Sequence, residues 1–229
     1  MNWGYEAVGR FNSWEEIANY PIDNDRKGNR TVVPGDIKYK DQNNDGVINY
    51  LDERPIGYRV DSTPTLNFGI NLAASWKGFD LAMDWTGSGM TSWQQCYETA
   101  RPFQNDGNSP DEVLKDAWHL SDIWDANSEL IPGKYPMLRL NSDETSAYDK
   151  STFWLHNVHY IKLRNLEFGY TLPKNWLGRS GISNLRVFVS GTNLLTLSNL
   201  SVMDPECVSD NGLDYPPMRV INLGVNLKF

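Results

Sequence analysis

The chain has 229 residues, and its 21 basic and 29 acidic side chains give a formal net charge of −8, which argues against a nucleic-acid-binding surface. The mean hydropathy of −0.53 and the lack of any run of about 18 apolar residues exclude a helical membrane protein. Nine Trp and eleven Tyr in so polar a chain favour either a soluble β-rich binding module or a membrane β-barrel with aromatic girdles.

The segment DQNNDGVINYLD, residues 41–52, has the spacing of a twelve-residue calcium loop. Gly46 supplies the sharp turn at the sixth position, and oxygen donors recur at the positions where a calcium loop places its ligands. The last position departs from an EF-hand, because it holds Asp in place of the bidentate Glu and so predicts a weaker site. The predicted ligands, in loop order, are Asp41, Asn43, Asp45, the carbonyl of Val47, Asn49 and Asp52.

Two other interpretations of this loop stay open. An Asx-rich turn held by its own side-chain hydrogen bonds would need no metal. The string also resembles a dockerin repeat, but that would require a second copy, which the sequence lacks. No amphipathic helix clearly flanks the loop on both sides, so a helix–loop–helix sensor is not expected. Calcium is the one cofactor that the sequence suggests.

Strict alternation of apolar and polar residues begins at Leu66 and continues to Trp76, with every even position apolar. A second run, from Phe79 to Thr86, has its apolar residues at odd positions. A period of two predicts strands with one apolar and one polar face. Only Lys77 and Gly78 separate the runs, and Gly78 can adopt a positive φ, so we expect a tight hairpin.

Three further strands are expected over residues 153–172, 185–194 and 221–229. In the first of these the apolar positions change from odd to even near Arg164 and Asn165, which predicts a β-bulge there. The five predicted strands are each near or above the roughly 9–11 residues that cross a bilayer when tilted.

The connections between these strands differ greatly in length. Lys77–Gly78 is minimal and residues 171–184 are intermediate, whereas residues 90–152 and 195–218 form long polar loops. Short turns on one side and long loops on the other fit a transmembrane barrel, while a soluble sandwich more often has short loops at both ends. The predicted fold class is therefore all-β, an antiparallel transmembrane β-barrel. The alternative is a secreted soluble β-sandwich module that binds glycan and calcium.

No catalytic signature is present, neither a Gly-x-Ser-x-Gly elbow nor a His-Glu-x-x-His, phosphate-loop or Cys-x-x-Cys motif. His156 and His159 flank the start of a strand, where histidines are more often interfacial than catalytic. The sequence thus predicts no enzyme, and a surface hydrolase is only a third, weaker possibility. Cys96 and Cys207 have no metal-ligand spacing and are either thiols or one disulfide.

Four tryptophans surround the long loop of residues 90–152. A Trp in such a loop is more often a packing residue or a partner contact than a platform for a sugar ring. They are Trp93, Trp118, Trp124 and Trp154.

Several segments, taken in order, resemble the C-terminal part of the SusC/RagA-like TonB-dependent outer-membrane transporters. Each block alone is weak, but their joint order is specific and they are spread over nearly the whole chain. They are WGYEAVGRFNSWEEI (residues 3–17), PGDIKYKDQNNDGVINYLDERPIG (34–57), YIKLRNLEFGYTLP (160–173), LRVFVSGTNLLTLS (185–198), DPE (204–206) and YPPMRVINLGVNLKF (215–229).

The resemblance implies a bacterial outer-membrane protein that imports large nutrients, such as oligosaccharides or peptides. It implies a SusD-like surface lipoprotein as a partner, and TonB as a second partner that acts through an N-terminal part ahead of Met1. The final amphipathic strand, ending on Phe229, resembles the signal read by the outer-membrane assembly machinery, which places the C-terminus in the periplasm. The resemblance identifies no substrate-binding residue.

The expected organisation is therefore an extracellular loop region over residues 1–65, with the calcium-like loop at 41–52, followed by the last five barrel strands and their connecting loops over residues 66–229. Five strands leave two unpaired edges and cannot enclose a lumen, so we expect this chain to be one part of a larger barrel.

Overall fold

The computed structural model describes residues 2–58, 64–104, 107–140, 144–178, 181–207, 211–212 and 214–229. The chain forms two compact units, each drawn from three separate stretches of sequence. The loop unit comprises residues 1–62, 92–157 and 208–214, and the sheet unit comprises residues 63–91, 158–207 and 215–229. None of the helices in the described ranges is both long and apolar enough to cross a membrane.

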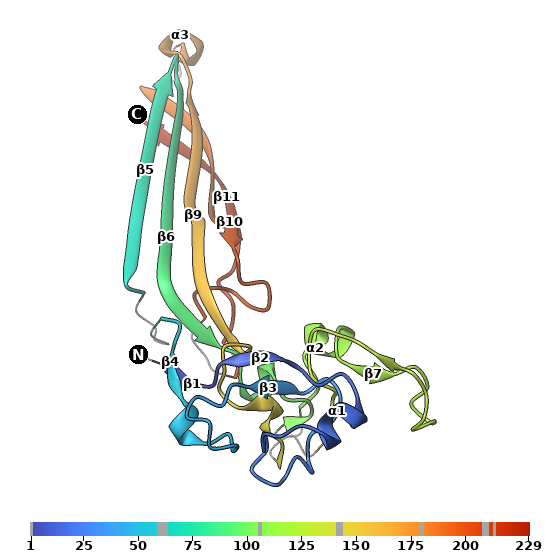
Figure 1. The fold of residues 1–229 in the computed structure, drawn as a ribbon. Coiled ribbons are helices and arrows are strands. Elements are labelled where there is room, and N and C mark those ends of the chain that lie inside the picture. Colours follow the sequence, from blue (N-terminus) through green and yellow to red (C-terminus); the bar gives the residue numbers. More distant parts are fainter. Residues whose placement is uncertain are drawn as a thin grey trace. The chain divides into compact units, whose positions relative to one another are not determined.

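The sheet unit is built on one five-stranded sheet (Figure 1). Its strands lie in the order β11-β10-β9-β6-β5, and the connection after β9 contains the short helix α3. The prediction of an all-β chain with five long strands is confirmed. The bounds are β5 (Leu66–Trp76), β6 (Phe79–Gln94), β9 (Leu155–Thr171), α3 (Lys174–Leu177), β10 (Asn184–Ser198) and β11 (Val220–Lys228).

The predicted hairpin joins β5 to β6. Lys77 and Gly78 have φ values of 49° and 89°, so both turn residues are in the left-handed region that a two-residue hairpin with matching twist requires. The pairing extends from Trp76 opposite Phe79 to Leu66 opposite Gly89. The strand β6 thus continues past Thr86, where its alternation ends, because backbone pairing with β5 persists through a Gly- and Ser-rich stretch that carries no apolar period.

The pairing of β9 with β10 shifts its register near the position where a bulge was predicted. Asn165 pairs with Thr192 of β10 and Leu163 pairs with Leu195, so two steps along β9 match three steps along β10. The irregularity lies at the predicted place along β9, but the extra residue belongs to β10, where Asn193 has a φ of 52°. The pairing continues beyond this bulge to Ser198, which makes β10 longer than the predicted segment ending at residue 194.

One face of the sheet carries large apolar side chains that are exposed in the described structure. In β5 every even position from Leu66 to Leu72 is at least two-fifths exposed. The apolar side of β11 is equally exposed, whereas β6 and β9 are only partly exposed apart from Phe79 and Phe168. A soluble fold would cover such a face with a second layer. Exposed apolar residues on these strands are Phe79 in β6, Phe168 in β9, Val187, Val189, Leu195 and Leu197 in β10, and Ile221, Leu223, Val225 and Leu227 in β11.

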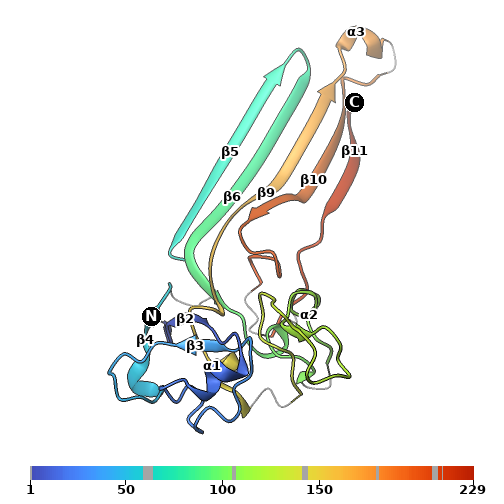
Figure 2. The ribbon, with the colours of Figure 1, turned by 45° about the vertical axis from the view of Figure 1, so that its right-hand side comes forward.

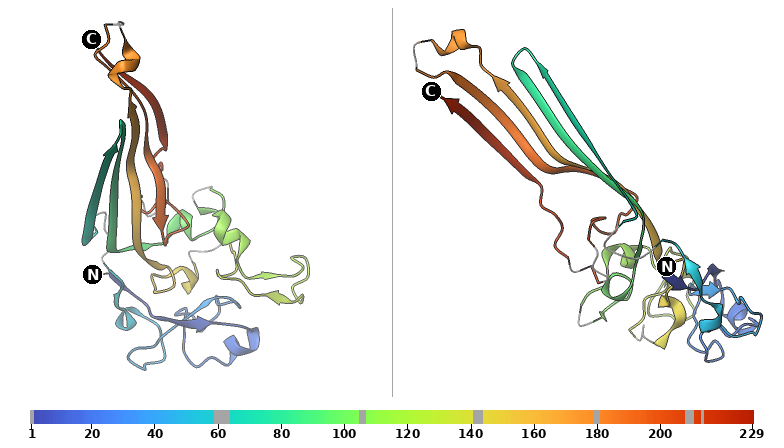
Figure 3. Two further views of the ribbon diagram at one scale, coloured as in Figure 1. Left: turned by 90° about the horizontal axis from the view of Figure 1, so that it is seen from above. Right: turned by 90° about the vertical axis from the view of Figure 1, so that its left-hand side faces the viewer.

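The described residues of the loop unit form short helices and strands (Figure 2). Three two-stranded pairings, β1 with β4, β2 with β3 and β7 with β8, are connected by loops and single-turn helices (Figure 3). The bounds are β1 (Asn2–Gly4), β2 (Ala7–Arg10), α1 (Trp14–Ala18), β3 (Ile37–Tyr39), η1 (Tyr50–Asp52), β4 (Arg54–Ile56), η2 (Tyr97–Thr99), α2 (Asp111–Lys115), β7 (His119–Leu120), β8 (Leu130–Ile131) and η5 (Ser146–Tyr148).

An aromatic core holds these short elements together. Trp154 is 1% exposed, and its ring stacks on those of Tyr135 and Tyr148, with centroids 5.8 and 5.6 Å apart. Its indole N–H donates to the carbonyl of Ala147 at 2.8 Å, so the polar edge of the ring is also satisfied. Residues from distant parts of the sequence, including Ile48 of the calcium-like loop, share this core.

Candidate functional site

The calcium-like loop is fastened to the core of the loop unit at its middle. Ile48 is completely buried, and its amide donates to the carbonyl of Asp23 at 2.9 Å. In return, the amide of Asp23 donates to the carbonyl of Gly46 at 2.8 Å. The loop is therefore positioned by a buried apolar side chain and a short backbone pairing, and its acidic side chains do not have to determine its path.

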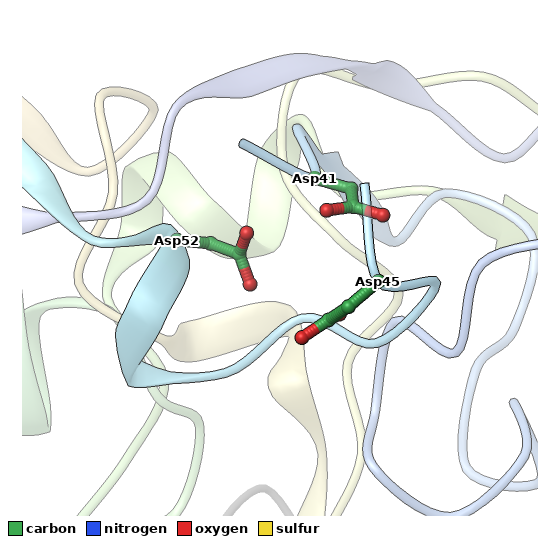
Figure 4. Close-up of side chains that lie close together, drawn as sticks. All are labelled: Asp41, Asp45 and Asp52. Atoms are coloured by element: carbon green, nitrogen blue, oxygen red, sulfur yellow. The ribbon is translucent and has the colours of Figure 1, made fainter. Parts of the chain in front are cut away.

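Three of the predicted ligands converge. Asp41, Asp45 and Asp52 each present a carboxylate oxygen, and these oxygens all lie within 4.8 Å of one another. Figure 4 shows the three carboxylates facing a common space inside the loop. Asp52 is completely buried, whereas Asp45 is exposed, so this space opens toward solvent on the side of Asp45.

Backbone amides hold these carboxylates in place. Asp41 accepts from the amides of Asn44 and Gly46 at 2.6 and 2.8 Å, and the positive φ values of both residues turn the chain around it. Asp52 accepts from the amides of Gln42 and Asn49 at 2.7 and 2.9 Å. A carboxylate has more lone pairs than these hydrogen bonds use, so the bonds orient the acids and leave lone pairs available to a cation.

The other predicted ligands make local hydrogen bonds. Asn43 donates from Nδ2 to Asp45 at 2.8 Å, and Asn49 donates from Nδ2 to the carbonyl of Val47 at 3.2 Å. The side-chain oxygen of Asn49 accepts from the amide of Leu51 at 2.9 Å, which caps η1. Such bonds are those of an Asx-rich turn, so the loop contains both a convergent acid set and the self-sufficient turn that was its alternative.

The three converging carboxylates of Asp41, Asp45 and Asp52 suit a hard cation. Hydrogen bonding from the Val47 amide, aided by Asn43, lowers the pKa of Asp45, so this carboxyl is ionised at neutral pH. Three carboxylates in so small a space repel one another unless positive charge lies between them. Calcium prefers oxygen ligands and tolerates irregular geometry, so the residues present fit this ion better than a metal that requires nitrogen or sulfur.

The polar face of the sheet holds a charged cluster that the sequence did not reveal. Arg186 of β10 pairs with Asp80 of β6 and, at 2.6 Å, with Glu167 of β9. One guanidinium thus connects three strands through side chains that all point to the same face. Alternation placed each residue on the polar face, but it gave no register between strands distant in sequence.

A second cluster ties the segment after β10 to the same sheet. Lys162 of β9 is only 1% exposed, and its ammonium lies 2.6 Å from Asp204 and 2.9 Å from Glu206. Glu206 also accepts from Tyr160 at 3.0 Å and from Arg164. Burial alone would raise the pKa of Glu206, but the hydrogen bonds from Lys162 and Arg164 outweigh it and lower the pKa. The DPE block at residues 204–206 was the one sequence signal of this contact.

The tryptophans of the long loop have two different roles. Trp93, Trp118 and Trp154 are each at most 6% exposed, so for these three the packing interpretation is confirmed. Trp124 is 90% exposed and follows Ile123, which is 73% exposed. Its amide donates to the Asp122 carboxylate at 2.9 Å, so this apolar tip belongs to an ordered turn.

His156, the two cysteines and Phe229 lie outside the acid and ion-pair clusters. The ring of His156 stacks on Trp93 with centroids 5.5 Å apart and hydrogen-bonds to Gln95, so it is a packing residue. No disulfide joins Cys96 to Cys207. Phe229 follows β11 and is 82% exposed, and its role as an assembly signal stays a prediction.

Comparisons with known proteins cover almost the whole chain. It is 30% identical to TonB-dependent receptor P3 and 28% identical to TonB-dependent receptor P26, both of Formosa agariphila, over 98% and 99% of its length. Among solved structures, it is similar to the RagAB peptide importer in the closed-closed state (TM-score 0.64, 22% identity) and in the open-open state (TM-score 0.62, 23% identity), over 99% of the chain in both cases. No protein-family profile matches.

The chain spans about a fifth of its relatives, 22% of the two receptors and 22–23% of the importer chains. The resemblance found in the sequence is confirmed, since the curated homologues are TonB-dependent receptors. The fold prediction is confirmed as well, by the likeness to the RagAB structures together with the five-stranded sheet.

Proposed function

We propose, from the premise that this chain is homologous to TonB-dependent receptors, that its sheet unit forms part of the wall of an outer-membrane transporter. The single observation that carries this proposal is the exposed apolar face of the sheet, opposite a face that bears ion pairs. Lipid is the environment in which such an apolar face is stable without a second covering layer, and a wet lumen accommodates the charged face.

The alternative of a soluble sandwich predicts the reverse burial. In a sandwich the apolar side chains of two sheets interdigitate and are inaccessible. Among the described residues, those of β5 and β11 are exposed along their whole apolar sides, so the structure gives this alternative no support.

Spin labelling of the full-length protein in phosphatidylcholine vesicles tests the proposal. With Cys96 and Cys207 replaced by Ser, a label at Leu72→Cys is expected to collide with lipid-soluble oxygen, and one at Asn71→Cys with an aqueous nickel chelate. The two positions are neighbours on β5 but face opposite sides of the sheet. Equal access of the nickel chelate to both labels would refute the membrane wall.

We further propose the finer features that the resemblance implies. The whole protein imports large nutrients such as oligosaccharides or peptides, with energy supplied through TonB and with a SusD-like lipoprotein as partner. The names of the relatives support this, since they are TonB-dependent receptors and a peptide importer. In this arrangement the short hairpin at Lys77–Gly78 lies on the periplasmic side with the C-terminus, and the long connections of residues 90–152 and 195–218 face outward.

We propose that Asp41, Asp45 and Asp52 bind calcium, because their carboxylates converge in an ordered loop. When bound, the ion would neutralise these acids and stiffen the loop. Titration calorimetry of the full-length protein with calcium chloride is expected to show one weak site, which Asp45→Ala removes. Asp111→Ala, an exposed acid on α2, is the matched control. Identical absence of heat in all three proteins would end the proposal.

We also propose that Phe229 contributes to recognition by the outer-membrane assembly machinery. Its exposed ring at the end of the apolar side of β11 supports this role. The variant Phe229→Ser is expected to lower the amount of assembled protein in the outer membrane, whereas Phe103→Ser, another exposed aromatic, is not. Equal amounts of both variants and the wild type would contradict it.

A further inference from the structure

One end of the sheet gathers the ends of all five strands into a continuous edge. The amide of Thr171 donates to the carbonyl of Gly78 at 2.8 Å, which joins the end of β9 to the β5–β6 hairpin. The amide of Leu172 donates to the carbonyl of Leu185 in β10, and the amide of Ser183 donates to the carbonyl of Lys228 in β11. Figures 1 and 2 show the hairpin, α3 and the C-terminal end of the chain at this same end of the sheet.

Large aromatic side chains surround this edge. Trp76 and Trp176 are 68% and 72% exposed, and Phe229 is 82% exposed. Phe79 is more sheltered, because it packs on Tyr170 with ring centroids 4.5 Å apart. Exposed aromatic rings at the end of an apolar sheet face are suited to the headgroup region of a membrane, where the ring contacts both acyl chains and polar groups.

Both connections at this edge and the end of the last strand each carry an exposed lysine: Lys77 in the hairpin, Lys174 at the start of α3, and Lys228 at the end of β11. Lys77 places its ammonium 4.7 Å from the centre of the Trp76 ring. The acid nearest this edge in the hairpin is Asp80, and it is paired with Arg186. The rim therefore combines positive charge with aromatic surface, in a chain whose overall charge is −8.

A hollow in the surface lies within this rim. It is lined by Ser75, Trp76, Lys77, Gly78, Phe79, Asp80 and Thr171. Trp76 and Phe79 give this lining aromatic character and Lys77 gives it positive charge, while Asp80, its one acid, is paired with Arg186. Such a combination suits a headgroup whose phosphate is anionic and whose chains continue along the apolar face of the sheet.

We propose that this rim, with Lys77, Lys174 and Lys228 as its charged residues, binds the phosphate groups of anionic glycerophospholipids and so fixes the depth of the sheet in the membrane. The inference rests on the proposed membrane wall, because only a sheet in lipid brings phosphate to this edge. Long lysine side chains reach headgroups while their methylene stems stay on apolar surface. Removal of one such charge is expected to lower the preference for an anionic lipid by about fivefold.

The test uses the full-length protein in nanodiscs made from a mixture of phosphatidylglycerol and phosphatidylcholine. After extraction into mild detergent, the lipids that stay bound are identified by mass spectrometry. The wild type is expected to retain phosphatidylglycerol in preference, and the triple variant Lys77→Gln, Lys174→Gln, Lys228→Gln to lose this preference. The matched control replaces three exposed lysines of the loop unit, Lys40, Lys115 and Lys150, by Gln and is expected to behave as the wild type.

Three outcomes would overturn the proposal. They are equal preference in the two triple variants, loss of bound lipid on addition of inorganic phosphate alone, and failure of Lys→Arg replacement at the three rim positions to keep the preference.

The need for detergent is scored separately in every variant, because it tests the membrane wall and not the rim. A triple variant that still needs detergent but shows wild-type lipid preference refutes the rim alone. A wild type that stays monodisperse in plain buffer refutes the membrane wall itself.

Discussion

The loop unit and the sheet unit bury their apolar residues in opposite ways. In the loop unit, short elements surround a closed aromatic core in which Trp154 and Tyr39 are almost inaccessible. In the sheet unit, the longest strands of the chain leave Leu72 and Leu223 exposed, while Lys162 is buried among acids. Each arrangement is the stable one for a different solvent, namely water for the loop unit and lipid for the sheet unit.

This contrast explains why composition alone was a poor guide. The mean hydropathy of −0.53 averages a polar, loop-rich unit with a sheet whose apolar residues are confined to one face. A strand that faces lipid on one side and a lumen on the other needs only every second residue to be apolar. The period of the pattern, and not the amount of apolar sequence, therefore identifies the membrane-facing part.

The largest expected effect is the loss of stability when the aromatic core of the loop unit is disrupted. Trp154→Ala removes the central ring of the loop unit and is expected to cost about 3–5 kcal/mol of local stability. Hydrogen exchange of the Ile48 amide, which is bonded to Asp23 in the same core, measures the effect in the full-length protein. Trp14→Ala, on exposed α1, should change this stability by less than about 0.5 kcal/mol. Similar losses in both variants would mean that the aromatic core is not the stabilising element.

The next effect probes the sheet with a change that a water-soluble protein would tolerate. Leu72→Arg places a charge in the middle of the apolar side of β5 and is expected to destabilise the protein by about 2–4 kcal/mol. Asn71→Arg, one residue away on the polar face and opposite Asp84, is the control and should be nearly neutral. Urea unfolding of the full-length protein in lipid vesicles gives both values. A neutral Leu72→Arg would show that this face is in water.

The sheet could be predicted from the sequence because its information is local. Alternation identified β5 and β6 and the turn at Lys77–Gly78, and the phase change near Arg164 identified the bulge. The alternation of apolar and polar residues did not predict the extension of β6 beyond Thr86. There the chain pairs through its backbone, and Gly87 lies beneath the Phe68 ring, where an added Cβ would be 2.1 Å from Cζ.

The loop unit and the charged clusters were less predictable because their contacts are distant in sequence. The spacing of residues 41–52 was enough to bring three acids together, since all of them lie in one turn. By contrast, the pairing of Arg186 with Asp80 spans 106 positions, and Trp154 meets Tyr135 only through the tertiary fold. Sequence reasoning assigned such residues to a face or a loop, but their partners depended on register and on packing.

A smaller effect distinguishes the one exposed tryptophan of the long loop from the buried ones. Trp124 and Ile123 form an apolar tip beside Asp122, which fits a contact with a partner protein. Trp124→Ala is expected to weaken binding of the proposed SusD-like lipoprotein partner by about thirtyfold, equivalent to about 2 kcal/mol, with no loss of stability. Surface plasmon resonance on the full-length protein, with Trp14→Ala as control, measures it. Unchanged affinity would remove this tip from the interface.

The smallest effect concerns the acid sensitivity of the loop unit. Glu112 accepts from Lys134 at 3.0 Å and from the Tyr135 hydroxyl at 2.9 Å. Burial opposes ionisation, but these bonds outweigh it and lower the pKa of Glu112. A carboxyl with a lowered folded-state pKa stabilises the fold above its unfolded pKa of about 4.3, and this stabilisation is lost as the pH falls through the folded value.

Glu112→Gln is therefore expected to destabilise the loop unit by only a few tenths of a kcal/mol at neutral pH, since the pair is partly exposed. The difference from the wild type should vanish once the pH falls below the lowered pKa of Glu112 in the folded state, where both side chains are uncharged. Hydrogen exchange of the Tyr135 amide, corrected for the pH dependence of the intrinsic exchange rate, measures the difference in stability between the two proteins at each pH. A difference that grew on acidification would have the wrong sign, because it would require the protonated carboxyl to be the form that stabilises the fold.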